Sequence, residues 1–307
     1  MPSSALETTR QLWRLAQGIV LAGTMLITGC SQVHYDPDWS TGPYFYATSF
    51  LNLEGGMMSA YRSHGGVLFT QVGTYFDAAL SDPYSIHIGN NWWLVYSESY
   101  NHLYPTRTMG IAKSTDGGIS YVKQPDLAPV ETIGCYEVGT PKFVINQDGS
   151  AFTDAQGYHL FFECFADQSF NHISFYEIHS TDLVSWSAPA NPVAGTNLPS
   201  SMQNPFCISM NGSFYLWYKS EALSTIEYSS AKNLLGPYTV VKNGDWAGWG
   251  STWDSESLVM TGPNTWVIYL TNPMSYSQST DNWATWSAPQ RVYPDGLRNG
   301  NVTLFNQ

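Results

Sequence analysis

The 307-residue chain carries 12 Lys and Arg against 24 Asp and Glu, a formal net charge of −12. This balance excludes nucleic-acid binding through bulk charge, because the phosphate backbone would be repelled. Charged residues make up only 12% of the chain, whereas Trp, Tyr and Phe reach 15%. The 26 Gly and 17 Pro disfavour long helices, and 43% apolar residues suffice for a large core, which excludes intrinsic disorder.

The amino-terminal residues are typical of a targeting signal. Arg10 and Arg14 precede an apolar stretch, residues 15–27, that is too short for a membrane span. The stretch ends in Ile-Thr-Gly-Cys, which resembles the bacterial lipoprotein box, where cleavage leaves a lipidated cysteine, here Cys30. An ordinary secretory signal is the alternative.

These signals divide the chain into a signal peptide (1–29), a linker (30–42) and one folded domain (43–307). The expected location is the bacterial cell envelope, facing the periplasm or on the outer membrane. The membrane would then be reached only through the amino-terminal lipid, and a secreted protein is the alternative.

Three further cysteines would lie in an oxidising compartment, where one pair can form a disulfide. We expect Cys135 to pair with Cys164, leaving Cys207 free. The chain has no Cys-x-x-Cys spacing, so the sequence gives no support for a structural zinc site.

Four segments repeat one pattern, in which a polar residue is followed by Pro or a polar residue and then by an apolar strand. They begin at Asp82, Thr140, Asn204 and Ser255, at intervals of roughly 50 to 65 residues. Each is followed by a turn and an aromatic strand: NWWLVYS, YHLFFE, SFYLWY and NTWVIYL. These pairs are predicted to be β-hairpins.

A third strand in each unit leads into a tight polar turn, as in KSTDGGISY, HSTDLVSW and QSTDNWATW. Asp side chains in such turns bond their own backbone. We therefore interpret these Asp residues as structural.

The remaining strands complete a fifth unit. YFYATSF, MMSAYRS and VLFTQVG, which begin at Tyr44, Met57 and Val67, supply three strands, and NVTLF, beginning at Asn301, supplies the fourth. A ring closed in this way leaves no open sheet edge. The sequence thus predicts an all-β, five-bladed β-propeller with one blade closed by the N- and C-terminal strands.

The ordered combination of the DP-opened strand, the HSTDLVSW turn, the SSAKNLLGPYTVV segment and the SESLV strand resembles glycoside hydrolases of family 43. The resemblance implies a general base Asp and a general acid Glu, each opening an inner strand, with a second Asp between them that tunes the acid. Asp82 matches the base and Glu256 the acid, although Asp254 lies on the same strand face and competes with it. Asn204 occupies the intermediate position.

Asn204 departs from the pattern, because an amide cannot supply the negative charge that keeps a neighbouring acid protonated. Glu137, Glu163 and Glu221 end strands or loops on the same face and are the alternative sources of that charge.

Other residues on this face are candidates for substrate binding. Trp246, Trp249 and Trp253 can stack on sugar rings, or pack between blades instead. His102 lies on the same face, and Arg298 can bind an acidic sugar or pair with Glu256. No cofactor and no His-ligated metal is expected, and a structural calcium ion at the propeller axis stays open.

Three functions are compatible with this pattern, all with an oligo- or polysaccharide partner and none with nucleic acid. The first is an inverting glycosidase acting on arabinose- or xylose-containing glycans. The second is a non-catalytic, surface glycan-binding lipoprotein. The third is a sialidase-like enzyme with Asp-box turns, against which five blades and scarce arginine count.

Overall fold

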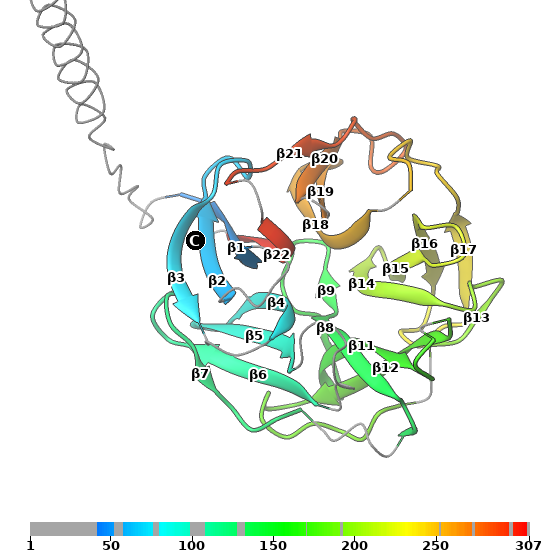
Figure 1. The fold of residues 1–307 in the computed structure, drawn as a ribbon, viewed down its shortest axis with the longest axis horizontal. Helices are drawn as coiled ribbons and strands as arrows, with labels where there is room; N and C mark the ends of the chain where they lie inside the picture. The colour runs from blue at the N-terminus through cyan, green and yellow to red at the C-terminus, as the bar shows by residue number, and fades with distance from the viewer. Residues whose placement is uncertain are drawn as a thin grey trace, which may run out of the picture. The chain divides into compact units, whose positions relative to one another are not determined.

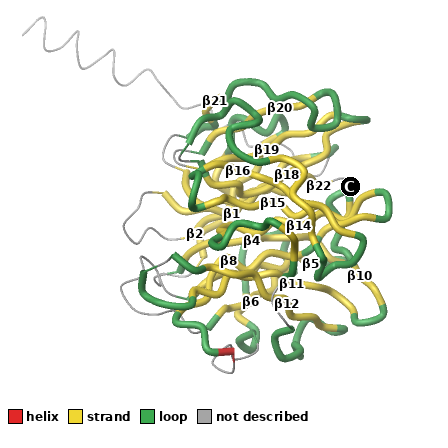
Figure 2. The backbone as a smooth tube through the Cα atoms, turned by 90° about the vertical axis from the view of Figure 1, so that its right-hand side faces the viewer, coloured by secondary structure: helices red, strands yellow, loops and turns green. Residues whose placement is uncertain are grey.

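The computed structural model describes residues 42–51, 58–75, 80–98, 108–127, 133–169, 171–190, 193–251, 253–271, 274–294 and 297–305. Cys30 and His102 lie outside the described residues, as do the predicted signal peptide and almost all of the linker. The described part consists mainly of β-strands joined by turns and loops, with a short helical segment (Figure 2). None of its segments is a helix long and apolar enough to cross a membrane.

In the described ranges the strands form five sheets arranged around a central axis (Figure 1). The first sheet holds β22 (Leu297–Phe305), β1 (Tyr44–Leu51), β2 (Met58–Ser63) and β3 (Thr70–Tyr75). The second holds β4 (Ser81–Ile88), β5 (Asn91–Ser97), β6 (Met109–Ser114) and β7 (Val122–Lys123). The third holds β8 (Glu137–Phe143), β11 (Gly157–Phe165), β12 (Ile173–Ser180) and β10 (Thr153–Asp154).

The fourth sheet holds β9 (Ile145–Asn146), β14 (Met202–Met210), β15 (Ser213–Ser220), β16 (Thr225–Ala231), β17 (Tyr238–Lys242) and β13 (Gly195–Thr196). The fifth holds β18 (Asp254–Gly262), β19 (Thr265–Thr271), β20 (Ser275–Ser279) and β21 (Gln290–Arg291). The predicted propeller arrangement is confirmed.

The innermost strands of the sheets contact one another in a closed cycle. β22 lies against β4 and β18, β4 lies against β8, and β14 lies against both β8 and β18. Side chains join neighbouring members of this cycle: Asn301 Oδ1 accepts the backbone N–H of Ser85 at 2.7 Å, and Ser257 Oγ accepts that of Val302 at 2.9 Å. β22 also pairs antiparallel with β1, which brings the two ends of the domain into one sheet.

One sheet has six strands where the repeat predicts four. The two additional strands are short and parallel: β9 pairs with β14, and β13 pairs with β17. β9 follows almost directly on β8, so the chain leaves one inner strand and joins the edge of the next sheet before it turns. The repeat pattern could not show this, because a pair of two-residue strands leaves no periodicity in the sequence.

The aromatic second strands fill the space between sheets, as their composition predicts. Trp92 of β5, Trp217 of β15 and Trp266 of β19 are each at most 2% exposed. Burial of these large rings stabilises the fold.

The repeated Asp turns are structural, as predicted. Asp116 accepts the backbone N–H of Ser120 at 2.9 Å, Asp182 that of Ser185 at 2.7 Å, and Asp281 that of Thr285 at 2.9 Å. These bonds lower the pKa of Asp182 and of Asp281 to about 2.

Candidate active site

A β-bulge interrupts the ladder of every inner strand at an equivalent place. In β4 the pairs Ser81–Ser97 and Tyr84–Val95 leave Asp82 and Pro83 opposite a single residue. The register shifts in the same way at four further positions: Thr140 in β8, Asn204 in β14, Glu256 in β18, and residues 299–300 in β22. A bulge re-aims side chains, so one backbone device presents a different side chain from each sheet.

Three of these bulges place a residue other than glycine in the left-handed region. The φ angles of Asp82, Thr140 and Asn204 are 51°, 50° and 56°, and each residue directly precedes a proline. Both features are disfavoured, because the side chain and the following ring crowd the backbone. Strain of this kind persists where the surrounding structure enforces it, and it clusters at functional sites.

The enforcing contacts come from the neighbouring sheet. Ser97, Glu163 and Lys219 occupy equivalent positions, each opposite the residue that precedes a bulge. Ser97 Oγ accepts the N–H of Thr140 at 3.0 Å, and Glu163 Oε1 accepts the N–H of Asn204. Lys219 Nζ lies 3.0 Å from Asp254 Oδ1 in the next inner strand. Three sheets thus hold the start of the inner strand that follows them.

The Asp82 carboxylate accepts hydrogen bonds from two hydroxyl groups. Its Oδ2 accepts from Ser81 Oγ at 2.9 Å and from Ser97 Oγ at 3.3 Å. Because Ser97 also accepts the N–H of Thr140, a hydrogen-bond chain runs from the bulge of β8 to the carboxylate in the bulge of β4. This chain orients the Asp82 carboxylate.

Glu163 is the most perturbed carboxyl group in the described part of the site. It is 3% exposed, and burial, helped by the negative charge of Asp82, raises its pKa to about 8. The N–H of Asn204, the Thr140 hydroxyl and the charge of Lys142 act in the opposite direction. Glu163 is therefore mostly protonated at neutral pH.

Gly139 lies close both to Ser97, which bonds Asp82, and to the carboxyl group of Glu163. A Cβ at this position would lie 3.6 Å from Ser97 Oγ and 3.7 Å from Glu163 Oε2. The partner of Asp82 and the carboxyl group of Glu163 therefore face the same small volume.

Two other predicted acids are bound to a lysine. Lys219 Nζ lies 3.3 Å from Glu221 Oε1 as well as 3.0 Å from Asp254. Burial acts to lower the pKa of Lys219, but the two carboxylates outweigh it and raise that pKa. Glu221 and Asp254 therefore share one lysine as their ion-pair partner.

The other predicted site residues are only partly placed. Glu256 lies in β18 at its bulge and Arg298 lies in β22, but both side chains fall outside the described atoms. Glu137 is buried at the start of β8, opposite Phe165. His102 lies outside the described residues.

The three tryptophans of the predicted binding loop pack against the main core. Trp249 is 8% exposed, and its indole N–H bonds Ser277 Oγ at 3.1 Å. The indole of Trp246 donates to Ile226 O and that of Trp253 to Trp249 O, each at 2.9 Å. Trp246 and Trp253 keep part of their surface in solvent, so sugar stacking by these two rings stays a prediction.

Beyond the bulges, apolar side chains of the inner strands close the axis. The ring centroids of Tyr84 and Phe206 lie 6.2 Å apart, and the cavity that they line with Leu258 has a volume of about 10 Å³. That is room for one water molecule at most. This cavity is therefore too small for a sugar.

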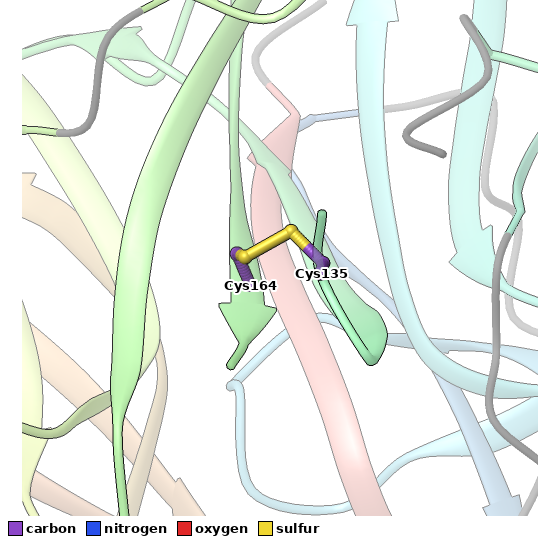
Figure 3. The surroundings of a disulfide bond; sticks show 2 residues. All are labelled: Cys135 and Cys164. Atoms are coloured by element: carbon purple, nitrogen blue, oxygen red, sulfur yellow. A yellow bond between two sulfur atoms is a disulfide. The ribbon is translucent and has the colours of Figure 1, made fainter. Parts of the chain in front are cut away.

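A disulfide fixes the strand that carries Glu163. Cys135 and Cys164 are joined, with Cα atoms 5.4 Å apart, which confirms the predicted pair (Figure 3). Cys164 is the neighbour of Glu163 in β11, and Cys135 precedes β8, so the bond ties these two strands together at the site. Cys207 is free and buried.

The fold has close counterparts among solved structures, although no family model and no curated protein matches the sequence. A thermostable family-43 glycoside hydrolase is 16% identical, with a TM-score of 0.56 over 84% of this chain and 93% of that one. The exo-β-1,3-galactanase 1,3Gal43A from Clostridium thermocellum is 12% identical, with a TM-score of 0.56 over 78% of this chain and 56% of that one.

Zg3597, a family 117 glycoside hydrolase from the marine bacterium Zobellia galactanivorans, is 13% identical, with a TM-score of 0.54 over 70% and 69% of the two chains. The chain thus has the β-propeller fold of these glycoside hydrolases. The resemblance to family 43 is confirmed at the level of the fold.

Proposed function

We propose that this protein is an inverting glycoside hydrolase acting on arabinose- or xylose-containing glycans. One observation carries the proposal: equivalent bulges on the inner strands hold Asp82, Asn204 and Glu256, in the order that the family resemblance implies for base, tuning residue and acid. The five sheets and the pairing of β22 with β1 support five blades, one of them closed by the terminal strands.

In the proposed reaction Asp82 is the general base. Its carboxylate takes a proton from a water molecule that attacks the anomeric carbon, while Glu256 donates a proton to the glycosidic oxygen as the bond breaks. Inversion requires roughly 6.5 to 9.5 Å between the two carboxyl groups, to leave room for that water. The hydrogen-bond chain through Ser97 supports the assignment of Asp82, because it orients the carboxylate before substrate arrives.

Two contacts separate the roles of the acids. The Asp254 carboxylate is held in an ion pair with Lys219, so it is already engaged, which favours Glu256 as the acid. Repulsion between the carboxyl groups of Asp82 and Glu163 favours one charge in the pair, and burial holds Glu163 neutral. The negative charge then remains on Asp82, where a base is required.

Glu163 lies beside Asn204 and accepts its backbone N–H, but a neutral Glu163 does not supply the negative charge of an intermediate Asp. It provides instead a carboxyl group from β11 that is coupled to Asp82. Glu137 and Glu221 are the alternatives left by the sequence, and Glu221 is paired with Lys219.

The second candidate is a glycan-binding propeller that does not hydrolyse its ligand. The amide side chain at position 204 favours it, because that position then provides hydrogen bonds without charge. Both candidates share a saccharide partner. They differ in whether acid and base variants change turnover or only ligand binding.

Aryl and alkyl glycosides distinguish the two candidates and the two acids. We expect wild type to release sugar from arabinosides or xylosides and Asp82→Asn to lose turnover on every substrate. Glu256→Gln should lose less activity on a nitrophenyl glycoside than on an alkyl glycoside, because a good leaving group needs no proton. Asp148→Asn, which changes a turn residue, is the matched control.

If wild type binds glycans but releases no sugar from a broad panel of arabinosides, xylosides and galactosides, the hydrolase proposal is wrong and the glycan-binding function stands. Equal losses of Glu256→Gln on both leaving groups would contradict the acid role.

We also propose that the protein is a lipoprotein of the bacterial cell envelope, anchored through Cys30. The disulfide supports an oxidising compartment. Labelling with a clickable fatty acid should mark wild type in the membrane fraction, and Cys30→Ser should remove the label. A wild-type protein without label would contradict the anchor.

A further inference from the structure

A second group of ionisable side chains lies on the hairpin of β11 and β12. His159 and His179 are directly opposite each other in the register, and Glu177 precedes His179 by two residues. Side chains alternate between faces along a strand, so all three lie on the same face of this antiparallel pair. His159 and Glu177 are 1% and 3% exposed. The sequence led us to expect no His-ligated metal, but the register places two histidines opposite each other.

The donor atoms of these residues converge. Glu177 Oε1 lies 2.6 Å from His159 Nδ1 and 3.3 Å from His179 Nδ1. One donor atom from each of the three residues can be chosen so that all lie within 4.8 Å of one another. The 3.3 Å separation matches two ligands that each lie about 2.0 to 2.2 Å from one tetrahedral ion. The 2.6 Å contact is a hydrogen bond, which an ion bound between the two atoms would replace.

The remaining nitrogen of His159 carries the partner that a metal-binding histidine needs. Asp154 Oδ1, in β10, lies 2.9 Å from His159 Nε2. A carboxylate on the far nitrogen fixes the tautomer that leaves the other nitrogen free to bind a metal, and it increases the basicity of the ring. This contact is separate from the cluster of three and points to the same ligand.

The group is also reachable and held in place. The side chain of His179 is 27% exposed, which gives an ion a route from solvent and leaves a position for water. Ser187 Oγ accepts the backbone N–H of His179 at 3.0 Å, so the strand position of that histidine is fixed.

We propose that His159, Glu177 and His179 bind one divalent transition-metal ion, of which Zn²⁺ is the best match to two imidazoles and a carboxylate. Asp154 acts as the positioning residue for His159. The ion would link β11 to β12 four residues away from Glu163, and the proposal does not rest on glycosidase activity.

The test uses the full chain after treatment with a chelator, with Zn²⁺ and then Co²⁺ as the only added ions. Titration calorimetry should show one Zn²⁺ per chain, and Co²⁺ should give visible absorption bands. His179→Ala should abolish the Co²⁺ bands and weaken Zn²⁺ binding at least tenfold. Asp154→Asn should weaken Zn²⁺ binding by about 10 to 100-fold while keeping one ion per chain.

The control is His172→Ala, which removes an exposed histidine that also has a carboxylate near it, Asp167 at 3.6 Å. It should bind Zn²⁺ as wild type does. Both informative positions, His179 and Asp154, are partly exposed, and circular dichroism verifies that each variant is folded. The proposal is overturned if wild type binds no stoichiometric Zn²⁺, or if folded His179→Ala binds it as tightly as wild type. In that case the group is a hydrogen-bonded imidazole between two carboxylates.

Discussion

The Asp turns and the bulges of the inner strands both recur from sheet to sheet, but only the Asp turns repeat the same side chain. The turn residues Asp116, Asp182 and Asp281 repeat both a side chain and its bonds, because each accepts backbone N–H groups of its own turn. The bulges of the inner strands repeat only the backbone, and they present Asp82, Thr140, Asn204 and Glu256. The constant side chain performs a structural task that every sheet needs. In the bulges, by contrast, the backbone conformation stays the same while the side chain changes from sheet to sheet. A functional site built on a repeated scaffold requires this combination.

The largest effect that separates the two features is expected at Asp82. Asp82→Asn should lower kcat by about 10² to 10⁴-fold, since it removes the proposed general base. Asn tolerates a φ of 51° and can accept the Ser81 and Ser97 hydroxyl groups, so the free energy of unfolding should change by less than about 1 kcal/mol. Steady-state kinetics and urea denaturation measure the two effects. A variant that loses stability in step with activity would make Asp82 a structural residue like the turn Asp residues.

Removal of the disulfide should have the next largest effect, and mainly on stability. The bond spans 29 residues, so the double substitution Cys135→Ala with Cys164→Ala should lower the free energy of unfolding by about 2 to 4 kcal/mol. The measurement is chemical denaturation under non-reducing conditions. Addition of a reductant to wild type should reproduce the loss. Unchanged stability would mean that the packing of β8 on β11 holds the site without the bond.

Glu163 gives a pH-dependent effect. Because its pKa is raised to about 8 from the usual 4.5, the folded protein binds a proton that the unfolded chain releases. The free energy of unfolding should therefore fall as pH rises from about 4.5 to about 8, by about 1 kcal/mol per pH unit. Glu163→Gln retains an acceptor for the N–H of Asn204, and it should show a flatter dependence over this range. Parallel pH profiles for wild type and variant would contradict the raised pKa.

The turn residue Asp182 should give the smallest effect and the opposite pH dependence. Its pKa is lowered to about 2, so its stabilising contribution is present above the usual value near 4 and is lost as pH falls from about 4 to about 2. Asp182→Ala should lower the Tm slightly at pH 7 and leave kcat unchanged. The difference in Tm from wild type should narrow at pH 2 to 3. A loss of kcat without loss of Tm would place the turn in the active site.

The propeller arrangement and the structural turns could be predicted because they depend on local signals. Polar openings, aromatic second strands and Asp turns recur in the sequence, and each has a local physical cause. The Cys135–Cys164 pair was predictable because few cysteines remained to choose from. The short strands β9 and β13 left no such signal.

The contacts that build the site could not be predicted, since they join residues of different sheets. The bonds of Ser97 to Thr140 and of Glu163 to Asn204 depend on how neighbouring sheets pack. The sequence did contain a signal for the pairing of His159 with His179. Pairing YHLFFE with the following strand ISFYEIHS about their connecting loop places His159 opposite His179, which alternation within either strand alone cannot show.

The central claim is that the bulge residues form an inverting hydrolytic site, and the configuration of the first sugar released tests it most directly. Proton NMR during hydrolysis of an arabinoside or xyloside by wild type should show the anomer opposite to that of the substrate before mutarotation begins, and Asp82→Asn should produce neither anomer. Release of sugar with the configuration retained, or no release at all from a substrate that binds, would contradict the account.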